Sequence, residues 1–403
     1  MRNVVVIGAG QAGASLVAKL RAQGFDGQIT LIGEEHVPPY QRPPLSKKYL
    51  LGEMELERLF LRPESFYAEN AIGLHLDEAV TAIDRVRKVV IAGDRSIPYD
   101  QLALTTGSQP RRLPAAVGGD LEGVHVVRTL ADVDAMAPEF REGARVLIVG
   151  GGYIGLEAAA VAAARGLDVT LVEAAPRILQ RVACEETAAY FRALHTRHGV
   201  DIREGTGLEI LAGARRVTGA KLSDGSEMAV DFVIVGIGIT PATRLAEAAG
   251  LAVENGISVD ELGRSSDPSI WAAGDCASFP HQGGRLRLES VPNAIEMAEC
   301  VAENMLGAGK PYVPQPWFWS DQYDVKLQIA GLGSGHDRIV TRPGAHENGI
   351  SFWYYKDERL LAVDAMNDAR AYMVGKRLID AGKSPDPRTV ADPATDLKSL
   401  LKA

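Results

Sequence analysis

Two segments of the sequence repeat the same pattern of a β-branched run, three spaced glycines and a helix-forming run. The first copy begins with the apolar residues 2–7, continues through Gly8, Gly10 and Gly13, and reaches Glu34 after a second apolar run. Strand, GxGxxG loop, helix, strand and acid in this order are typical of the βαβ unit that binds a dinucleotide. The pattern therefore predicts a Rossmann-like domain in this part of the chain.

Each glycine of the pattern has its own physical reason. The first permits a tight turn, the second lets the backbone approach a pyrophosphate, and the third allows close packing of helix and strand. The pyrophosphate then lies at the N-terminus of the helix, where free N–H groups and the helix dipole favour an anion. The acid at Glu34 is placed to accept hydrogen bonds from ribose hydroxyls.

The second copy has the same order. It starts with the run 145–149 and continues through Gly150, Gly152 and Gly155 to Glu173. Two complete copies in one chain predict two bound dinucleotides. Two dinucleotides without another substrate motif indicate flavin plus nicotinamide, with hydride passing from one ring to the other. We therefore expect a redox enzyme that uses FAD and NAD.

The acid of the second copy bears on the choice between NADH and NADPH. A carboxylate at Glu173 accepts a hydrogen bond from a free 2′-hydroxyl and repels a 2′-phosphate, which favours NADH. Arg177 lies four residues further along, and a free cation there would favour the phosphate. The sequence favours NADH and leaves the part of Arg177 open.

Charge and hydropathy exclude several classes of partner. The chain of 403 residues has a formal net charge of −9, whereas nucleic-acid binding requires a basic surface. The apolar run 4–7 is too short for a signal-peptide core, and no run approaches the length of a membrane helix. We expect a cytoplasmic protein that binds neither nucleic acid nor membrane.

The three cysteines, Cys184, Cys276 and Cys300, are few and widely spaced. An odd, sparse set without CxxC spacing indicates reduced thiols and no disulfide framework. An iron–sulfur cluster needs four ligands, usually all cysteine, so we expect neither a cluster nor another bound metal in this chain. The sequence assigns no role to the three thiols.

Three further segments carry a resemblance to a known family. They are PPLSK at 43–47, GDCA at 274–277 and PWFWSDQ at 316–322. Together with the two glycine patterns, they resemble the NADH-dependent ferredoxin reductases of bacterial monooxygenase and dioxygenase systems, in particular the putidaredoxin-reductase type. The resemblance covers nearly the whole chain. It implies an FAD-dependent ferredoxin–NAD(+) reductase that passes electrons from NADH to a two-iron two-sulfur ferredoxin, which serves a haem monooxygenase or a dioxygenase.

The resemblance also implies the fold class and the domain boundaries. It implies an α/β chain with two Rossmann-like dinucleotide-binding domains, the second inserted in the first, and a C-terminal α+β domain. The FAD-binding domain would comprise residues 1–110 and 240–315, the NAD-binding domain residues 111–239, and the C-terminal domain residues 316–403.

The family gives three positions a part in the reaction. A lysine matching Lys47 lies beside the flavin, and a tryptophan matching Trp319 faces the electron acceptor. An acid matching Glu157 meets the nicotinamide carboxamide and is expected to pair with Lys47. An ammonium beside the ring stabilises the negative charge that hydride adds to it. The residues alone leave other interpretations open: a solvated lysine that starts a helix, a first-turn acid favoured by the helix dipole, and a tryptophan in a hydrophobic domain junction.

The resemblance implies further cofactor contacts. Asp275 follows an apolar run and would bind the ribityl chain of FAD, or else cap the following segment. Matching by position places the other FAD contacts at Gly8, Gly10, Ala12, Gly13, Glu34, Lys47, Val80, Arg128 and Val291, where the two valines also suit an ordinary core. It places the NAD contacts at Gly150, Gly152, Tyr153, Ile154, Gly155, Glu173 and Gly238.

One departure from related enzymes matters for the route of the electrons. Disulfide reductases of this fold need a redox cysteine pair after the first glycine pattern, and peroxidases and oxidases of this fold need a single cysteine there. This chain has no cysteine before Cys184, so a flavin–thiolate adduct cannot form. The flavin must pass electrons out directly. Two alternatives to a ferredoxin reductase stay open: an NADH oxidase, and a redox-sensing protein resembling apoptosis-inducing factor.

Direct exit of electrons requires the acceptor to approach closely. Ferredoxins of such systems are typically acidic, so their attraction to a chain with a net charge of −9 requires a local basic face. Candidates for this face are Arg285, Arg287, Lys326 and Arg338, which flank the segments expected near the flavin.

Overall fold

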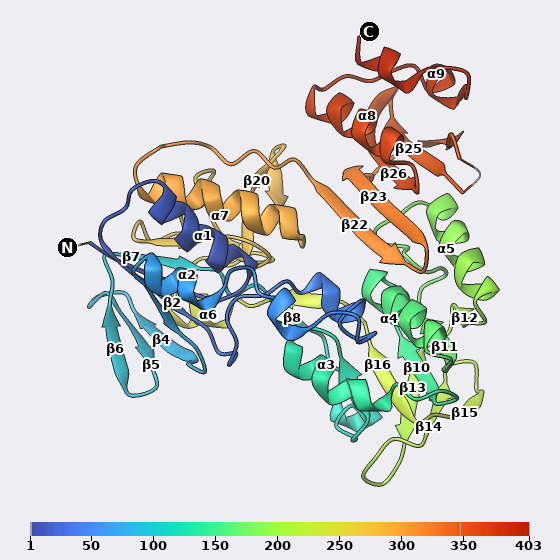
Figure 1. Ribbon diagram of the computed structural model, residues 1–403, viewed down its shortest axis with the longest axis horizontal. Coiled ribbons are helices and arrows are strands. Elements are labelled where there is room, and N and C mark those ends of the chain that lie inside the picture. The colour runs from blue at the N-terminus through green and yellow to red at the C-terminus, as the bar shows by residue number, and fades with distance from the viewer. Residues whose placement is uncertain (1, 347, 403) are drawn as a thin grey trace. The chain divides into compact units, whose positions relative to one another are not determined.

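The structure of the chain is a computed structural model that describes residues 2–346 and 348–402 (Figure 1). It divides into two compact units. Unit 1 comprises the chain up to Gln41, Glu55–Gln109 and Ile239–Pro316, and unit 2 comprises Arg42–Met54, Pro110–Gly238 and the chain from Trp317 onward. Each unit contains a parallel sheet built on one of the two glycine loops.

The central sheet of unit 1 is parallel. Its elements are β1 (Asn3–Ile7), α1 (Gln11–Ala22), β2 (Gln28–Ile32), β3 (Ile72–His75), β7 (Gln101–Leu104) and β19 (Ile270–Ala272). The strands lie in the order β19-β7-β1-β2-β3, with β1 in the middle. β1 is buried from Val4 to Ile7, as expected for a parallel strand covered on both faces. The predicted first βαβ unit is therefore present.

Smaller elements complete unit 1. They are η2 (Leu56–Arg58), α2 (Glu64–Glu69), the antiparallel strands β4 (Val80–Asp84), β5 (Val89–Ala92) and β6 (Arg95–Pro98), the pair β8 (Ser108–Pro110) and β17 (Ile239–Pro241), α6 (Arg244–Ala248), β18 (Ile257–Ser258), β20 (Ala277–His281), β21 (Gly284–Leu286) and α7 (Val291–Met305). α7 packs along α1 (Figure 1), where Lys19 forms an ion pair of 2.8 Å with Glu303.

Unit 2 repeats the arrangement around the second glycine loop. Its parallel sheet has the order β12-β11-β10-β16-β9, so β10 is central as β1 is in unit 1. The elements are η3 (Ala115–Val117), β9 (Val124–Val126), α3 (Leu130–Met136), η4 (Ala137–Glu139), β10 (Arg145–Val149), α4 (Tyr153–Ala164), β11 (Asp168–Glu173), α5 (Glu185–Arg197), β12 (Asp201–Glu204), the antiparallel β13 (Leu208–Ala212), β14 (Gly219–Leu222) and β15 (Glu227–Ala229), and β16 (Phe232–Val235).

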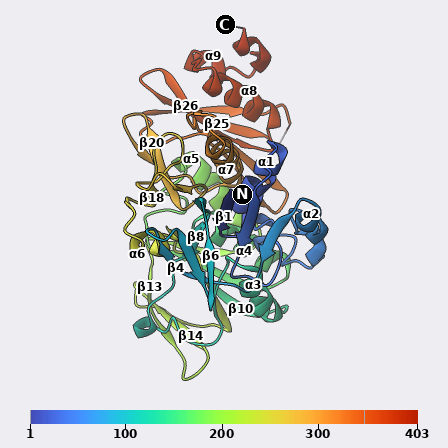
Figure 2. The ribbon, with the colours of Figure 1, turned by 90° about the vertical axis from the view of Figure 1, so that its left-hand side faces the viewer.

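The C-terminal part of unit 2 is an antiparallel sheet with a helix against it. The strands lie in the order β22-β23-β26-β25-β24. α8 packs on β23 and on β26, which is labelled beside α8 in Figure 2. The bounds are β22 (Trp317–Gln322), β23 (Val325–Gly331), β24 (Arg338–Pro343), β25 (Ile350–Lys356), β26 (Arg359–Met366), α8 (Ala369–Asp380), α9 (Pro387–Ala391) and η5 (Leu397–Leu401). Two parallel-sheet Rossmann-like domains and this antiparallel domain confirm the predicted fold class.

The segment 42–54 lies in unit 2; it belongs to residues 1–110, whose assignment to the FAD-binding domain stays a prediction. It contains the short helix η1 (Pro43–Ser46). Two long-range hydrogen bonds attach it to its neighbours: Arg42 Nη1 donates to the carbonyl of Arg128 at 2.7 Å, and the Tyr49 hydroxyl donates to Asp134 at 2.8 Å. Local sequence patterns carry no signal for these two bonds, because they join residues 86 and 85 positions apart in the sequence.

α4 is covered by its own sheet and also by elements outside that sheet. It contacts β10 and β11, and it also contacts η1 and β22. Its sequence is almost entirely apolar, and every residue from Gly155 to Ala162 is buried, including the single charged residue, Glu157. The packing of η1 and β22 against α4 therefore places one carboxylate inside unit 2.

A second buried carboxylate, Asp364 of β26, joins the C-terminal sheet to α5. It accepts hydrogen bonds from the hydroxyls of Tyr354 and Thr187, the latter at 2.7 Å. The Tyr354 hydroxyl in turn accepts the backbone N–H of Cys184 at 2.9 Å, directly before α5. Burial raises the pKa of Asp364 to about 6, even though both hydrogen bonds act in the opposite direction.

The pKa of Asp364 predicts how the free energy of unfolding changes with pH. The folded value, about 6, lies above the ordinary 3.8, so the folded chain takes up this proton first as the pH falls. The contribution of Asp364 to stability therefore rises between about pH 6 and pH 4, by up to roughly 3 kcal/mol. We expect the wild type to gain stability relative to Asp364→Asn over this interval, measured by urea unfolding at several pH values.

His195, buried in α5, supplies the matched control of opposite sign. Burial lowers its pKa from 6.5 to about 4, so the unfolded chain takes up this proton first and stability is lost as the pH falls through that interval. The wild type should therefore lose stability relative to His195→Asn between about pH 6.5 and pH 4. Parallel pH curves for the wild type and both variants would contradict this account.

Candidate active site

In the glycine loop of unit 1, backbone carbonyl oxygens crowd the first and third glycines, whereas the second glycine faces open space among the described atoms. Gly8 has a φ of +111°, and a Cβ there would lie 2.3 Å from the carbonyl oxygen of Thr105; a Cβ at Gly13 would lie 2.1 Å from that of Gly8. Around Gly10, the N-cap of α1, no described atom lies within 4 Å of such a Cβ. An anion can therefore approach the N-terminus of α1 at Gly10, which fits the pyrophosphate of FAD.

The loop of unit 2 has the same geometry. Gly150 has a φ of +109°, and a Cβ there would lie 2.4 Å from the carbonyl oxygen of Gly236; a Cβ at Gly155 would lie 2.1 Å from that of Gly150. Gly152, the N-cap of α4, again has open space around it among the described atoms. Each unit thus holds one loop shaped for a dinucleotide.

The FAD contacts predicted in unit 1 lie around the first loop and at element ends. Asp275 follows β19 and accepts a hydrogen bond of 2.8 Å from Ser108 Oγ. Ala12 is buried beside Gly274, so α1 and the end of β19 meet there. Glu34 is exposed just beyond β2, while the half-buried Val80 and Val291 are the first residues of β4 and α7. Their contacts with FAD stay predictions.

Lys47 and Glu157 form an ion pair in unit 2. The Lys47 Nζ lies 2.6 Å from Glu157 Oε2, and the two side chains are 15% and 5% exposed. Ser46 Oγ donates to the same carboxylate oxygen at 2.7 Å, and Ser320 Oγ donates to Oε1 at 2.6 Å. Three donors therefore surround one carboxylate, which offsets the desolvation of a buried charge.

This geometry corrects two of the open interpretations. Lys47 is not a solvated residue at the start of a helix, because it follows η1 and its ammonium is paired. Glu157 is not a first-turn acid, because α4 begins at Tyr153 and has no acid in its first turn. The dipole explanation therefore does not account for Glu157.

Side chains alternate along β22 between two different environments. Phe318, Ser320 and Gln322 meet α4 and α5: the Phe318 ring lies 4.9 Å from that of Tyr153, and Ser320 and Gln322 bond to Glu157 and His195. On the other face Trp317 and Trp319 stack with ring centroids 5.6 Å apart. Trp319 is thus the half-buried partner of a tryptophan pair, and its place near an electron acceptor stays a prediction.

Glu173 is held at the end of β11 by the backbone of two loops. Its Oε2 accepts the N–H of Gly151 at 2.7 Å, and its Oε1 accepts the N–H of Ala175 at 2.8 Å. These bonds place the carboxylate beside the second glycine loop and still leave each oxygen a lone pair for a ribose hydroxyl. The position suits the predicted recognition of NADH.

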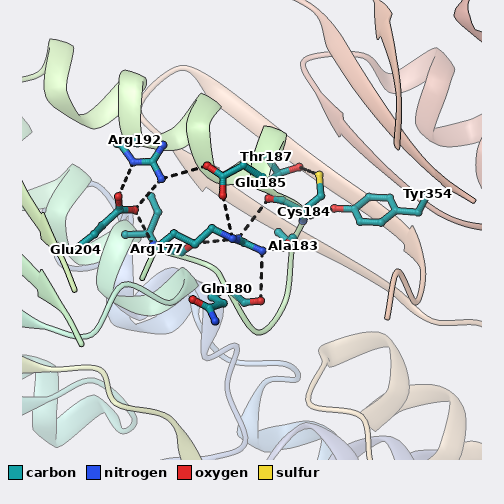
Figure 3. Close-up of polar contacts among 10 residues, drawn as sticks. Arg177, Gln180, Ala183, Cys184, Glu185, Thr187, Arg192, Glu204 and Tyr354 are labelled. Carbon is teal, nitrogen blue, oxygen red and sulfur yellow. Dashed lines mark hydrogen bonds and ion pairs between the residues drawn. The ribbon is translucent and has the colours of Figure 1, made fainter. Parts of the chain in front are cut away.

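Arg177 is committed to the loop that comes after β11 (Figure 3). Its guanidinium donates to the carbonyl of Ala183 at 2.8 Å, makes longer hydrogen bonds to other carbonyls of the same loop, and forms an ion pair of 3.1 Å with Glu185. A guanidinium has five N–H donors in a fixed fork, and these contacts occupy it. The fork therefore shapes the loop, and its committed donors support the prediction that Glu173, not Arg177, decides between NADH and NADPH.

Four further residues of unit 2 were predicted as cofactor contacts, and their contacts stay predictions. Ile154 is 40% exposed beside the loop. The Tyr153 hydroxyl is buried and has no hydrogen-bond partner among the described residues, and burial raises its pKa well above the ordinary value. Gly238 has a φ of +98° and its carbonyl accepts the N–H of Arg111. Arg128 is half-buried at the carbonyl that Arg42 contacts.

The four candidates for a basic docking face are unequal. The Arg287 side chain is only 9% exposed and pairs with Glu289 at 2.6 Å, so it is not available as a surface charge. Arg285 donates to the carbonyl of Val259 at 2.9 Å, and Arg338 pairs with Glu358 at 3.1 Å. Lys326 is exposed and remains the better candidate.

Two polar partners of Glu157 received no role from the sequence. They are Ser46 and Ser320, which stand in the quoted segments PPLSK and PWFWSDQ. Gln322, in the same PWFWSDQ segment, and His195 bond beyond Ser320 and also received none. The position of the two serines next to Lys47 and the tryptophans was the available signal. Among the described residues, no helix combines the length and apolar character needed to cross a bilayer, and no cluster of His, Cys, Asp or Glu forms a possible metal site.

Comparison with protein families covers most of the chain. Residues 2–298 match the family described as pyridine nucleotide-disulphide oxidoreductase, and residues 317–401 match the family described as reductase C-terminal.

Individual relatives match over the full length. The chain is 44% identical to a ferredoxin–NAD(P)(+) reductase of a Sphingomonas species, with 99% of this chain and 97% of the relative covered. It is 41% identical to putidaredoxin reductase of Pseudomonas putida, with 100% and 97% covered. Among solved structures, the covalent complex of putidaredoxin reductase with putidaredoxin matches with a TM-score of 0.95 at 40% identity, covering 100% of this chain and 98% of that one.

Gly152 and Gly155 of the second loop should respond differently to substitution by alanine. Gly155→Ala should destabilise unit 2 by about 1–3 kcal/mol, because its Cβ would enter the space of a carbonyl oxygen. Gly152→Ala should leave the thermal unfolding midpoint near the wild-type value and weaken NAD(+) binding, because its methyl group meets only the approach to the helix N-terminus. Thermal unfolding and calorimetric titration with NAD(+) separate the two effects; equal losses in both variants would contradict the geometry.

The carboxylate at the end of β11 should set the choice of nicotinamide. We expect Glu173→Ala to lose preference for NADH over NADPH by on the order of 1–3 kcal/mol, measured as the ratio of kcat/KM values. The control is Arg177→Gln, which should lower the thermal midpoint without altering that ratio. If the wild type used both nucleotides equally, or if Arg177→Gln altered the ratio alone, the assignment of these two residues would be wrong.

Proposed function

Because the chain belongs to the pyridine nucleotide-disulphide oxidoreductase family, we propose that it is an FAD-dependent ferredoxin–NAD(+) reductase, which passes electrons from NADH to a two-iron two-sulfur ferredoxin. The observation that carries the proposal is that one chain contains both an open glycine loop in each unit and the buried Lys47–Glu157 ion pair. The ferredoxin would serve a haem monooxygenase or a dioxygenase. The proposed compartment is the cytoplasm.

The cysteines favour direct electron exit over a thiol relay. Cys184, Cys276 and Cys300 are all free and buried, and none lies near the first glycine loop in the sequence. Burial raises the pKa of each thiol, so none is set up as a nucleophilic thiolate. The disulfide chemistry in the family's description therefore has no counterpart in this chain.

The ion pair in unit 2 has a proposed part in the first half-reaction. Bound FAD supplies the conversion between two-electron and one-electron transfer. Lys47 provides a cation that stabilises negative charge gained on reduction, and Glu157 provides an acceptor that orients the carboxamide of the nicotinamide. The distances from Ser46 and Ser320 to Glu157 support this proposal, because they fix the carboxylate in one orientation.

The tryptophan pair of β22 has a proposed part in the second half-reaction. Trp319 lies on the face of β22 opposite to Ser320, away from Glu157. The solved structure of putidaredoxin reductase is a covalent complex with putidaredoxin. The Sphingomonas relative is named a ferredoxin–NAD(P)(+) reductase. We propose that Trp319 lies where the ferredoxin approaches, and that Lys326 contributes to its electrostatic attraction.

The proposed function predicts that the two half-reactions respond differently to the same change. Higher salt should slow reduction of a ferredoxin by the NADH-reduced protein and barely change reduction of FAD by NADH, because exposed charges are screened over about 8 Å at physiological ionic strength. Trp319→Ala should likewise slow the second half-reaction more than the first. Anaerobic stopped-flow measurement of each half-reaction provides the test.

The control for Trp319→Ala is Trp317→Ala, which alters the same stacked pair. It should have the smaller effect on ferredoxin reduction. If salt and Trp319→Ala changed both half-reactions equally, or neither, the docking site would lie elsewhere. If the reduced protein reacted promptly with oxygen and with no ferredoxin, it would be an NADH oxidase; a long-lived reduced complex with NAD that passed no electrons would instead indicate a redox sensor.

A further inference from the structure

A continuous series of hydrogen bonds leads from the Lys47–Glu157 ion pair into the interior of unit 2. Ser320 Oγ bonds to Glu157 Oε1 at 2.6 Å, and Gln322 Nε2 bonds to Ser320 Oγ at 3.1 Å. His195 Nε2 lies 2.8 Å from Gln322 Oε1, and the hydroxyl of Tyr323 lies 3.2 Å from His195 Nδ1. We call Ser320, Gln322, His195 and Tyr323 the α5–β22 chain.

The chemistry of each group sets the direction of every bond in the α5–β22 chain. An amide oxygen only accepts, so His195 carries its proton on Nε2 and donates to Gln322. Burial lowers the pKa of His195 to about 4, so at neutral pH the ring has one proton and Nδ1 accepts from Tyr323. Gln322 donates its N–H to Ser320, whose own hydroxyl proton is then directed at Glu157. All four bonds point toward the carboxylate.

Burial seals the inner part of the α5–β22 chain. His195 and Ser320 are 0% exposed and Gln322 is 1% exposed. The α5–β22 chain ends at the half-buried Tyr323. The ring of Tyr323 stacks on that of His198 with the centroids 3.7 Å apart, and its φ is +54°. A non-glycine residue in this left-handed region costs about 1 kcal/mol or more. A strained, bonded and stacked tyrosine thus closes the chain on the side away from Glu157.

The α5–β22 chain orients charge and does not conduct protons. Grotthuss transfer requires each member to accept a proton on one side and release another, which the amide of Gln322 does not readily do. An amide between a neutral imidazole and a hydroxyl instead fixes which atom donates. The hydroxyl of Ser320 accepts from Gln322 and therefore presents its proton to Glu157.

We propose that His195 and Gln322 are positioning residues for the NADH half-reaction: they hold the Ser320 hydroxyl as a permanent donor to Glu157, and so fix the carboxylate that pairs with Lys47. This inference rests on the proposed function, because it assigns the ion pair to hydride transfer. Both residues act on the ion pair through Ser320, which lies 163 residues away from Glu157 in the sequence.

The matched variants are His195→Leu and His195→Gln. Leucine removes the donor, so the Gln322 amide can reverse and Ser320 is no longer restricted to donating. Glutamine places an amide N–H near the position of Nε2 and keeps the direction of the hydrogen bonds in the α5–β22 chain. We expect His195→Leu to slow hydride transfer from NADH to FAD by on the order of tenfold, the lower range for loss of a supporting hydrogen bond around a reacting group, and His195→Gln to restore most of that loss.

The readouts separate positioning from folding and from the identity of the acceptor. Hydride transfer is followed by anaerobic stopped flow without ferredoxin, NAD(+) affinity of the oxidised holoprotein by calorimetry, and folding by the thermal midpoint. The exposed Thr196→Leu on the same helix controls for a leucine in α5. NAD(+) affinity should weaken in His195→Leu and recover in His195→Gln, while electron release from dithionite-reduced protein to ferricyanide stays at the wild-type rate.

A third variant keeps the inference testable if His195→Leu does not fold. Gln322→Glu replaces the N–H donor to Ser320 by an acceptor, which turns the Ser320 proton away from Glu157, and it should slow hydride transfer as His195→Leu does. Wild-type hydride transfer and NAD(+) affinity in either folded variant, or equal losses in His195→Leu and His195→Gln, would overturn the proposal. Failure of every ferredoxin to accept electrons would refute the proposed function and leave these measurements unaffected.

Discussion

The buried carboxylate of Glu157 is the constraint on which the rest of unit 2 depends. An uncompensated buried charge is strongly unfavourable, by several kcal/mol even after relaxation, so the chain must bring donors to it. Ser46 is the last residue of η1, Lys47 follows it, and Ser320 comes from β22. One charge on an otherwise apolar helix thus ties together the NAD-binding sheet, the segment 42–54 and the C-terminal sheet. Substituting the lysine alone would leave that charge without its counter-ion.

The two glycine loops show how the same backbone geometry can be built twice with different surroundings. In each unit the first and third glycines are required by nearby carbonyl oxygens, and the second faces open space. The loops differ in the residues at the end of the next strand. In unit 2, Glu173 is fixed by backbone N–H groups and Arg177 is committed to the adjoining loop, an arrangement that suits the predicted selection of NADH by the Glu173 carboxylate.

β22 presents two different faces, and the proposed function would use one for each half-reaction. Because side chains alternate along a strand, Phe318, Ser320 and Gln322 meet the helices α4 and α5, and Trp317 and Trp319 lie on the opposite face. One strand can therefore support the ion pair on one side and present an aromatic surface on the other. The hydrogen bonds of Asp364 and Tyr354 add a second connection between α5 and the C-terminal sheet.

The sequence by itself determined the two βαβ units, the places of their glycines, the lack of a cysteine before Cys184 and the family resemblance, because these depend on residues close together in the chain or on their absence. Lys47 and Glu157 could be named from the sequence only by resemblance, and the residues alone also suited a solvated lysine and a first-turn acid. Only the tertiary structure decided that Glu157 is enclosed, that Arg177 is committed to its loop and that Arg287 is not a surface charge. The bonds from Glu157 to Ser46 and Ser320 span 111 and 163 residues. No local periodicity records such contacts, because they form only when separate segments pack together.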